Sequence, residues 1–280
     1  MGIAGYVHFP RGRRFARFLM INALRGDVGA RWPALLASAL HYSPEDTSEE
    51  DIFLQQTSYR RELAGIAVCR RQDPWFACLG NYTAPSVDNR WGTDRQSFVS
   101  LWHRRSGLII GGGNSRNQPE AGNLCWDRDD RTLYVPDAIE AVPGDDSDAV
   151  ILSLGAHRVE FRARSGDDRS TVTIRLLSDA PADGLRAGLP LRIVPGSPLK
   201  VDGNDYLPPE AGLRAQAHGS MTVAHGAWRI RVPDGCTVVY PVKPFNPYHP
   251  DGDAPPEDFR AAIVLPLTGV REYEVGIEVP

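Results

Sequence analysis

Residues 159–176 read VEFRARSGDDRSTVTIRL, and this stretch decides the fold class. The patterns V-x-F-x-A and V-x-I-x-L flank a Gly-Asp-Asp sequence at residues 166–168. A period of two places alternate side chains on opposite faces of a β-strand, and a Gly-Asp pair between two such runs reverses the chain. The stretch therefore predicts an antiparallel hairpin with one buried face.

The same period of two recurs along the chain to its C-terminus, with Pro and Gly separating the runs. Strands with one buried and one wet face are typical of antiparallel sheets, and many short strands indicate a sandwich or barrel. We expect residues 63–280 to form a large antiparallel β-sandwich. Its predicted core comprises Phe161, Ile174, Trp228, Ile230, Val238, Ile263, Leu265 and Val275.

Residues 1–62 follow a different period. Phe15, Phe18, Leu19 and Ala23 stand at i, i+3, i+4 and i+8, which is one face of an α-helix. Residues 47–50 have the Thr-x-x-Glu form of a capping box. The predicted fold class is therefore mainly β, with the large antiparallel β-sandwich preceded by a short α-helical segment.

The composition excludes some classes of binding partner. The formal net charge is -4, which argues against nucleic acid, because a phosphate-binding surface needs a basic excess. No apolar run is long enough to span a membrane, so no membrane partner is expected. The N-terminus lacks a secretory signal, so the chain as it stands reads as cytoplasmic, or as periplasmic or secreted if the true N-terminus is missing.

The four cysteines match no metal-binding spacing and are too sparse for a disulfide framework. Cys69 and Cys78 could face each other across a hairpin, but free thiols are the favoured interpretation. Histidine pairs at ligand spacing are absent, although His225 and His249 stand near predicted strand ends. We therefore expect no cofactor and no metal, a structural divalent ion being unsupported.

One segment, residues 81–126, is dense in amides, arginines and aromatic residues. Amide and guanidinium groups satisfy neighbouring sugar hydroxyls, aromatic faces stack on pyranose rings, and arginine pairs with carboxylate or sulfate. The segment predicts a carbohydrate site. Its candidate residues are Tyr82, Arg90, Trp91, Arg95, His103, Asn114 and Gln118.

Two features of this segment have plainer interpretations. Gly111-Gly112-Gly113 lacks the helix start that a phosphate-cradling loop requires, so the glycines are better explained by a strand bulge or by a ligand approaching the backbone. His103 follows an apolar strand, where a histidine is more often a satisfied structural residue than a catalyst.

The helical tail up to Phe53, the change to strands near Leu63, and the segment from Asn89-Arg90-Trp91 to Gln118 resemble the heparinase II/III-like polysaccharide lyases. In that family an α/α toroid precedes an antiparallel β-sandwich. The resemblance implies that residues 1–62 are the tail of a toroid, that an N-terminal helical domain is missing, and that the partner is an acidic polysaccharide or oligosaccharide.

The resemblance also implies β-elimination on a uronic-acid-containing polymer, which needs a base, an acid and a group that neutralises the carboxylate. His103 is then the candidate base and Tyr82 the candidate acid. Arg90, Arg95 and Asn114 are the candidate carboxylate contacts, and Trp91 and Gln118 are further candidates for substrate binding. Two alternatives stay open: a non-catalytic carbohydrate-binding sandwich, and a structural sandwich without a small-molecule ligand.

Overall fold

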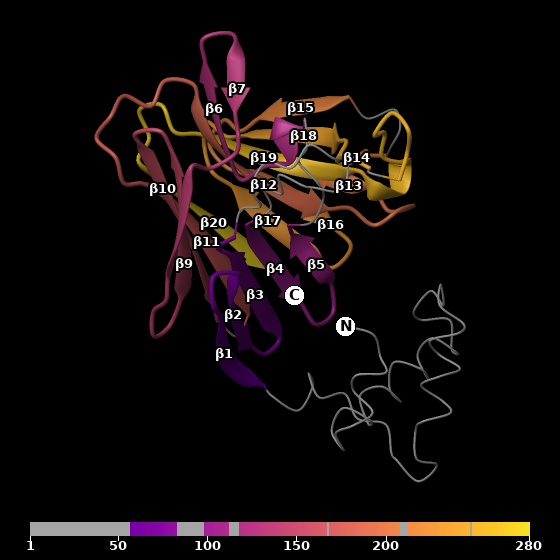
Figure 1. Ribbon diagram of the computed structural model, residues 1–280. Coiled ribbons are helices and arrows are strands. Elements are labelled where there is room, and N and C mark those ends of the chain that lie inside the picture. The colour runs from indigo at the N-terminus through magenta and orange to yellow at the C-terminus, as the bar shows by residue number, and fades with distance from the viewer. Residues whose placement is uncertain (1–56, 83–97, 112–117, 167, 208–211, 247) are drawn as a thin grey trace. The chain divides into compact units, whose positions relative to one another are not determined.

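The structure is a computed structural model that describes residues 57–82, 98–111, 118–166, 168–207, 212–246 and 248–280. The chain divides into two units, Met1–Thr57 and Ser58–Pro280. The helices predicted within residues 1–56 lie outside the described residues, as do Arg90, Trp91, Arg95 and Asn114. The second unit is a mainly β domain (Figure 1).

Two antiparallel sheets make up this domain, one of eleven and one of nine strands within the described residues. The first sheet has the order β1-β2-β3-β4-β5-β12-β19-β18-β15, with β6 beside β12 and β7 beside β6. Its strands are β1 (Ser58–Leu63), β2 (Ala67–Gln72), β3 (Trp75–Gly80), β4 (Val99–His103), β5 (Gly107–Ile110), β6 (Leu124–Arg128), β7 (Arg131–Leu133), β12 (Leu185–Arg192), β15 (Leu213–Gln216), β18 (Thr237–Val242) and β19 (Arg260–Pro266).

The second sheet has the order β14-β13-β16-β17-β20-β11-β10-β9-β8. Its strands are β8 (Ala138–Val142), β9 (Asp148–Leu154), β10 (His157–Ser165), β11 (Arg169–Leu176), β13 (Leu199–Val201), β14 (Asn204–Tyr206), β16 (Met221–His225), β17 (Trp228–Val232) and β20 (Glu272–Glu278). The described helices are two single 3-10 turns, η2 (Pro119–Ala121) and η3 (Pro256–Asp258). No helix among the described residues is long and apolar enough to cross a membrane.

The hairpin predicted from residues 159–176 is confirmed. Strands β10 and β11 pair antiparallel, with Phe161 opposite Ile174 and Val159 opposite Leu176. The apolar residues of the alternation are buried and most residues between them are half-buried or exposed. The period of two in the sequence therefore becomes one dry and one wet face of the second sheet.

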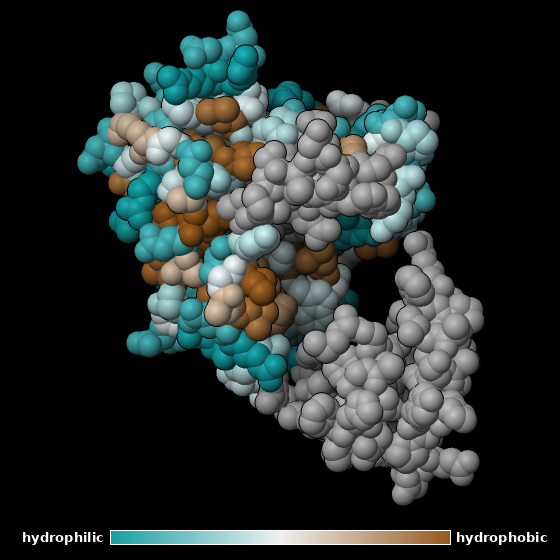
Figure 2. All heavy atoms as spheres, in the orientation of Figure 1, coloured by the Kyte–Doolittle hydropathy of each residue, from teal (hydrophilic) through white to brown (hydrophobic). Residues whose placement is uncertain are grey.

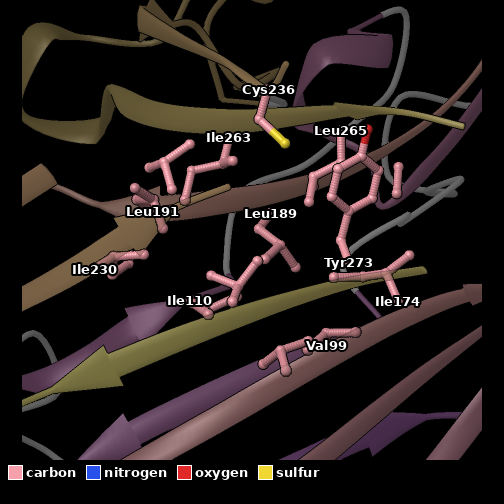
Figure 3. Packing of buried hydrophobic residues seen from close by; sticks show 14 of the residues in the cluster. Val99, Ile110, Ile174, Leu189, Leu191, Ile230, Cys236, Ile263, Leu265 and Tyr273 are labelled. Atoms are coloured by element: carbon pink, nitrogen blue, oxygen red, sulfur yellow. The ribbon is translucent and has the colours of Figure 1, made fainter. Parts of the chain in front are cut away.

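All eight predicted core residues are buried, with at most 3% of any of them exposed. Figure 3 shows how the core is built from both sheets: Leu189 and Leu265 come from the first sheet, and Ile174, Ile230 and Tyr273 come from the second. One continuous cluster joins the inner faces of the two sheets, which is the packing of a β-sandwich.

The predicted start of the β region was five residues late. Helix was expected through residue 62, but Ser58–Leu63 forms β1 and pairs with β2 along its whole length. Tertiary structure explains the difference. Because β1 is an edge strand with mostly exposed side chains, the hydrophobic pattern that marks a buried strand is weak there. Pairing with β2 outweighs local preference at these residues.

Candidate functional site

The described ends of β3, β4 and β5 within the predicted sugar-binding segment lie close together in the first sheet. Strand β3 ends at Gly80, whose N–H donates to the carbonyl of Phe98 just before β4 begins (2.8 Å). Strand β5 ends at Ile110, which lies opposite Leu101 of β4. The end of β3, the start of β4 and the end of β5 are therefore neighbours at one end of adjacent strands. Tyr82 lies there with 57% of its surface exposed.

Asn123 holds this edge in place. It is fully buried, and its Oδ1 accepts hydrogen bonds from the backbone N–H groups of Phe98 (2.5 Å) and Val99 (3.2 Å). Its Nδ2 donates to the carbonyl of Gly188 on β12 (2.9 Å). One amide side chain thus ties the start of β4 to the strand beyond β5. Its importance was not recognised from the sequence.

Gly111 closes the same edge by a close backbone approach. Its φ is +106°, and a Cβ there would lie 2.8 Å from Ser100 Oγ and 2.9 Å from the Val99 carbonyl. The β4–β5 register also shifts between Leu101 and Trp102. The sequence predicted a strand bulge or a close backbone approach at these glycines, and this explanation fits Gly111. The backbone of β4 is the group that lies close to it.

His103 lies in a different place. It is buried, its ring packs edge-on against Trp75 (centroids 4.6 Å apart), and its Nδ1 accepts from the N–H of Arg105 (3.2 Å). Burial first, and then the Arg105 charge, lower the pKa of His103, which favours a neutral ring. These contacts describe a satisfied structural histidine, the alternative that the sequence left open.

The predicted base and acid are not brought together. His103 lies opposite Trp75 at one end of the β3–β4 pair, whereas Tyr82 follows Gly80 at the other end. Five residues of strand separate the two ends, roughly 16 Å at about 3.3 Å per residue. A base and an acid that act on one sugar must both be within hydrogen-bond reach of it. The described geometry therefore gives no support to this pair.

Gln118 is half-buried directly before η2, and its carbonyl accepts from the N–H of Ala121 (3.0 Å). Gln118 precedes Asn123 by five residues in the chain. Asn123 and the following strand β6 both lie beside β12. Convergence of Arg90, Arg95 and Asn114 on this edge remains a prediction, because they lie outside the described residues.

A row of aromatic residues crosses the outer face of the first sheet. Direct cross-strand partners link Tyr59, Arg71, Phe76, Trp102 and Leu108 from β1 to β5. All except Arg71 are half-buried, so their faces are partly open to solvent. Figure 2 shows apolar side chains gathered on the surface where Figure 1 draws β4 and β5. We call Tyr59, Phe76 and Trp102 the aromatic row.

Two arginines accompany the aromatic row. The Arg61 guanidinium lies 5.0 Å from the centroid of the Tyr59 ring, and that ring is 6.4 Å from the ring of Phe76. Arg71 is buried between Tyr59 and Phe76, and its Nη2 is 3.3 Å from Asp73 Oδ1. Asp73 also receives Arg104 Nη2 at 2.6 Å. The face therefore combines flat apolar surface with guanidinium groups.

The described buried histidines make other contacts than metal coordination. His225 Nε2 accepts from the N–H of Val194 (2.8 Å), and its Nδ1 lies 3.0 Å from the Pro198 carbonyl. His157 packs edge-on against Trp126. Within the described ranges no group of three or more His, Cys, Asp or Glu side chains is arranged to hold a metal ion.

No family model and no curated protein matches the chain. Among solved structures, a chondroitinase AC lyase studied in oligosaccharide complexes matches with a TM-score of 0.51 and 12% identity over 96% of this chain and 42% of its own. The chondroitin AC lyase of Streptomyces coelicolor A3 (TM-score 0.46, 12% identity, 96% and 39% covered) and the 4-alpha-glucanotransferase of Thermococcus litoralis (0.45, 11%, 96% and 49%) are more distant. The chain thus spans less than half of each of these proteins, and the first likeness shows a shared fold.

Proposed function

We propose that this chain is the β-sandwich part of a carbohydrate-active protein and binds an acidic polysaccharide or oligosaccharide on the outer face of its first sheet. The aromatic row carries this proposal. Three partly open aromatic rings, on β1, β3 and β4, offer stacking surfaces for successive sugar rings. The guanidinium of Arg61 adds positive charge beside the Tyr59 ring, which favours a sugar that carries a carboxylate or sulfate.

The reaction that we propose for the whole protein is β-elimination on a uronic-acid-containing polymer, as in the heparinase II/III-like lyases. Support comes from the fold shared with a chondroitinase AC lyase, of which this chain spans 42%. In this proposal Tyr82, Arg90, Trp91, Arg95, Asn114 and Gln118 are further substrate contacts beside the aromatic row.

The second candidate is a non-catalytic carbohydrate-binding sandwich, and the position of His103 favours it. A buried histidine at the far end of the β3–β4 pair from Tyr82 does not provide the proton transfers of an elimination. Incubation with chondroitin or a heparin-type polymer distinguishes the two candidates. An unsaturated product absorbing in the ultraviolet supports the lyase, whereas binding without such a product supports the binding module.

The first test removes one ring of the aromatic row. We expect Trp102→Ala to weaken binding of a uronate-containing oligosaccharide at least tenfold, because a lost stacking surface costs on the order of 1.4 kcal/mol or more. Isothermal titration measures the dissociation constant. Tyr206→Ala, which removes a half-buried aromatic ring from the second sheet, is the matched control and should bind as the wild type does. Equal affinity in Trp102→Ala and the wild type would contradict the proposal.

A further inference from the structure

Arg260 is a buried cation for which the described residues provide no counter-ion. Only 8% of the residue is exposed, and no carboxylate of the described residues lies within ion-pair distance of it. Its Nη1 donates to the carbonyls of Asp258 (2.5 Å) and Phe259 (3.2 Å), and its Nε is buried without a hydrogen-bond partner. Buried charges in proteins are almost always paired, so this arrangement needs an explanation.

A second arginine makes the arrangement more unfavourable. Arg192 of β12 is the direct cross-strand partner of Arg260. Its own contacts are weak: Nη1 is 3.9 Å from Asp258 Oδ1 and donates to the Glu257 carbonyl at 3.2 Å. Burial first, and then the like charge of Arg192, lower the pKa of Arg260 to about 10, so the Arg260 guanidinium remains charged at neutral pH. Like charges directly opposite each other destabilise a sheet.

The two arginines lie on the outer face of the first sheet, the face that carries the aromatic row. Their neighbours Leu191 and Ala261 belong to the core, so the alternation of each strand turns Arg192 and Arg260 outward. On that face Val242 is the direct cross-strand partner of Arg260 and belongs to a small apolar cluster with Ala121 and Ala262. Strand β12 is two strands from β4 and Trp102, about 10 Å at the usual strand spacing.

We propose that Arg192 and Arg260 form an anion-binding site for an oxyanion, the carboxylate or sulfate of an acidic sugar. An oxyanion here offsets the repulsion between the two guanidinium groups and pairs with both. Anion binding by the pair stands on the geometry alone, whereas the sugar as its carrier rests on the proposed function.

Thermal unfolding with sodium sulfate, compared with sodium chloride at equal ionic strength, tests the site. We expect millimolar sulfate to raise the melting temperature of the wild type by about 3 °C or more, because a ligand of the folded state stabilises it. Arg260→Met and Arg192→Gln should lose this response. Arg175→Gln, which removes an exposed, ion-paired arginine on the second sheet, is the matched control and should keep it.

The outcomes separate the two proposals. An equal sulfate response in all four proteins, or none in the wild type, overturns the anion site. If Arg260→Met does not fold, the variant Arg192→Gln, at a half-buried position, decides. Glucuronate and glucose then identify the molecule that carries the anion. If glucuronate raises the melting temperature and glucose does not, the ligand is an acidic sugar. If sulfate raises the melting temperature but neither sugar does, the anion site stands and the acidic sugar is contradicted. Trp102→Ala should retain the full sulfate response, so the aromatic row can fail without the anion site.

A separate observation concerns Cys69 of β2 and Cys78 of β3. They are direct cross-strand partners, both half-buried, with Sγ atoms 2.8 Å apart, and both are free thiols. The N–H of Asn81 donates to the Ile66 carbonyl, which marks that pair as hydrogen-bonded. Alternation along the ladder then makes Cys69 and Cys78 a non-hydrogen-bonded pair, in which opposing side chains lie closest. That Cys69 and Cys78 could face each other across a hairpin was one of the two interpretations of the sequence.

We infer that this dithiol is a site of reversible oxidation by low-molecular-weight disulfides. The Cys78 thiolate attacks one sulfur of the disulfide RSSR and releases RS⁻. Cys69 then gives up its proton and attacks Cys78 Sγ, which releases the second RS⁻, so that the dithiol is oxidised and RSSR is reduced to two RSH. The hydrogen bond from the Cys69 thiol lowers the pKa of Cys78 and raises that of Cys69, which makes Cys78 the first nucleophile.

Oxidised glutathione tests the inference. Thiol titration after denaturation should fall from the four cysteines to two, the intact mass should drop by two hydrogens, and the melting temperature should rise by about 5 °C, because the cross-link restricts the unfolded chain. Cys78→Ser should show none of these changes, whereas Cys236→Ser should show the mass loss and the rise. A wild type that keeps four thiols, or that carries only glutathione adducts, overturns the inference.

Discussion

Replacing Asn123 by alanine is expected to destabilise the domain by about 3–5 kcal/mol. The side chain is fully buried and serves Phe98, Val99 and Gly188 at once. Alanine leaves two buried N–H groups and one buried carbonyl without partners, and each such group costs about 1–3 kcal/mol. Urea unfolding followed by fluorescence measures the change.

Asn204 on β14 provides the matched control for that experiment. It is exposed, and Asn204→Ala should change the free energy of unfolding by less than about 0.5 kcal/mol. Because Asn123 positions the start of β4, a stable Asn123→Ala variant should also bind oligosaccharide more weakly than the control does. A free energy of unfolding within about 1 kcal/mol of the wild type would show that water or a backbone shift replaces the amide.

The strands and the core residues were predictable because the period of two is a local property of the chain. The spacing of Phe161 and Ile174 in the sequence is enough to predict that they lie on a buried face, and both are fully buried. The order of strands in the sheet is not local. Nothing near Arg192 or Ile110 indicates that β12 lies between β5 and β19, since those partners come from segments roughly 80 residues earlier and 70 residues later.

The candidate site that we propose was less predictable from the sequence than the fold, for the same reason. Tyr59, Phe76 and Trp102 stand on three different strands, and each looks like an ordinary strand residue until the pairing places them in one row. Arg260 looks like a solvated charge at a strand start, and only its burial beside Arg192 distinguishes it. His103 was singled out by residue type, whereas its packing against Trp75 became evident only from the pairing of β3 with β4.

Asp148 joins the two sheets through a second buried polar group. It starts β9 of the second sheet with 3% of its surface exposed. Its Oδ1 accepts from Arg60 Nε of β1 (2.9 Å) and its Oδ2 from Arg70 Nε of β2 (2.8 Å). Burial by itself would raise the pKa of Asp148, but the hydrogen bonds from Arg70 and Arg60 outweigh burial and lower it.

We expect Asp148→Asn to cost about 2–3 kcal/mol at neutral pH, less than a fully buried pair because Arg60 is one-third exposed. A carboxyl whose folded pKa is lowered stabilises the fold above its unfolded pKa of about 3.9, and that contribution is lost as the pH falls through the folded value. The difference between wild type and Asp148→Asn should therefore be constant above about pH 5 and shrink progressively below about pH 4. Urea unfolding at a series of pH values measures it, with Asp179→Asn, at an exposed ion pair, as the control that should track the wild type throughout. A difference that stays constant down to pH 2, about two units below the unfolded pKa, would mean that the loss comes from side-chain shape and not from the charge that holds β1 and β2 to β9.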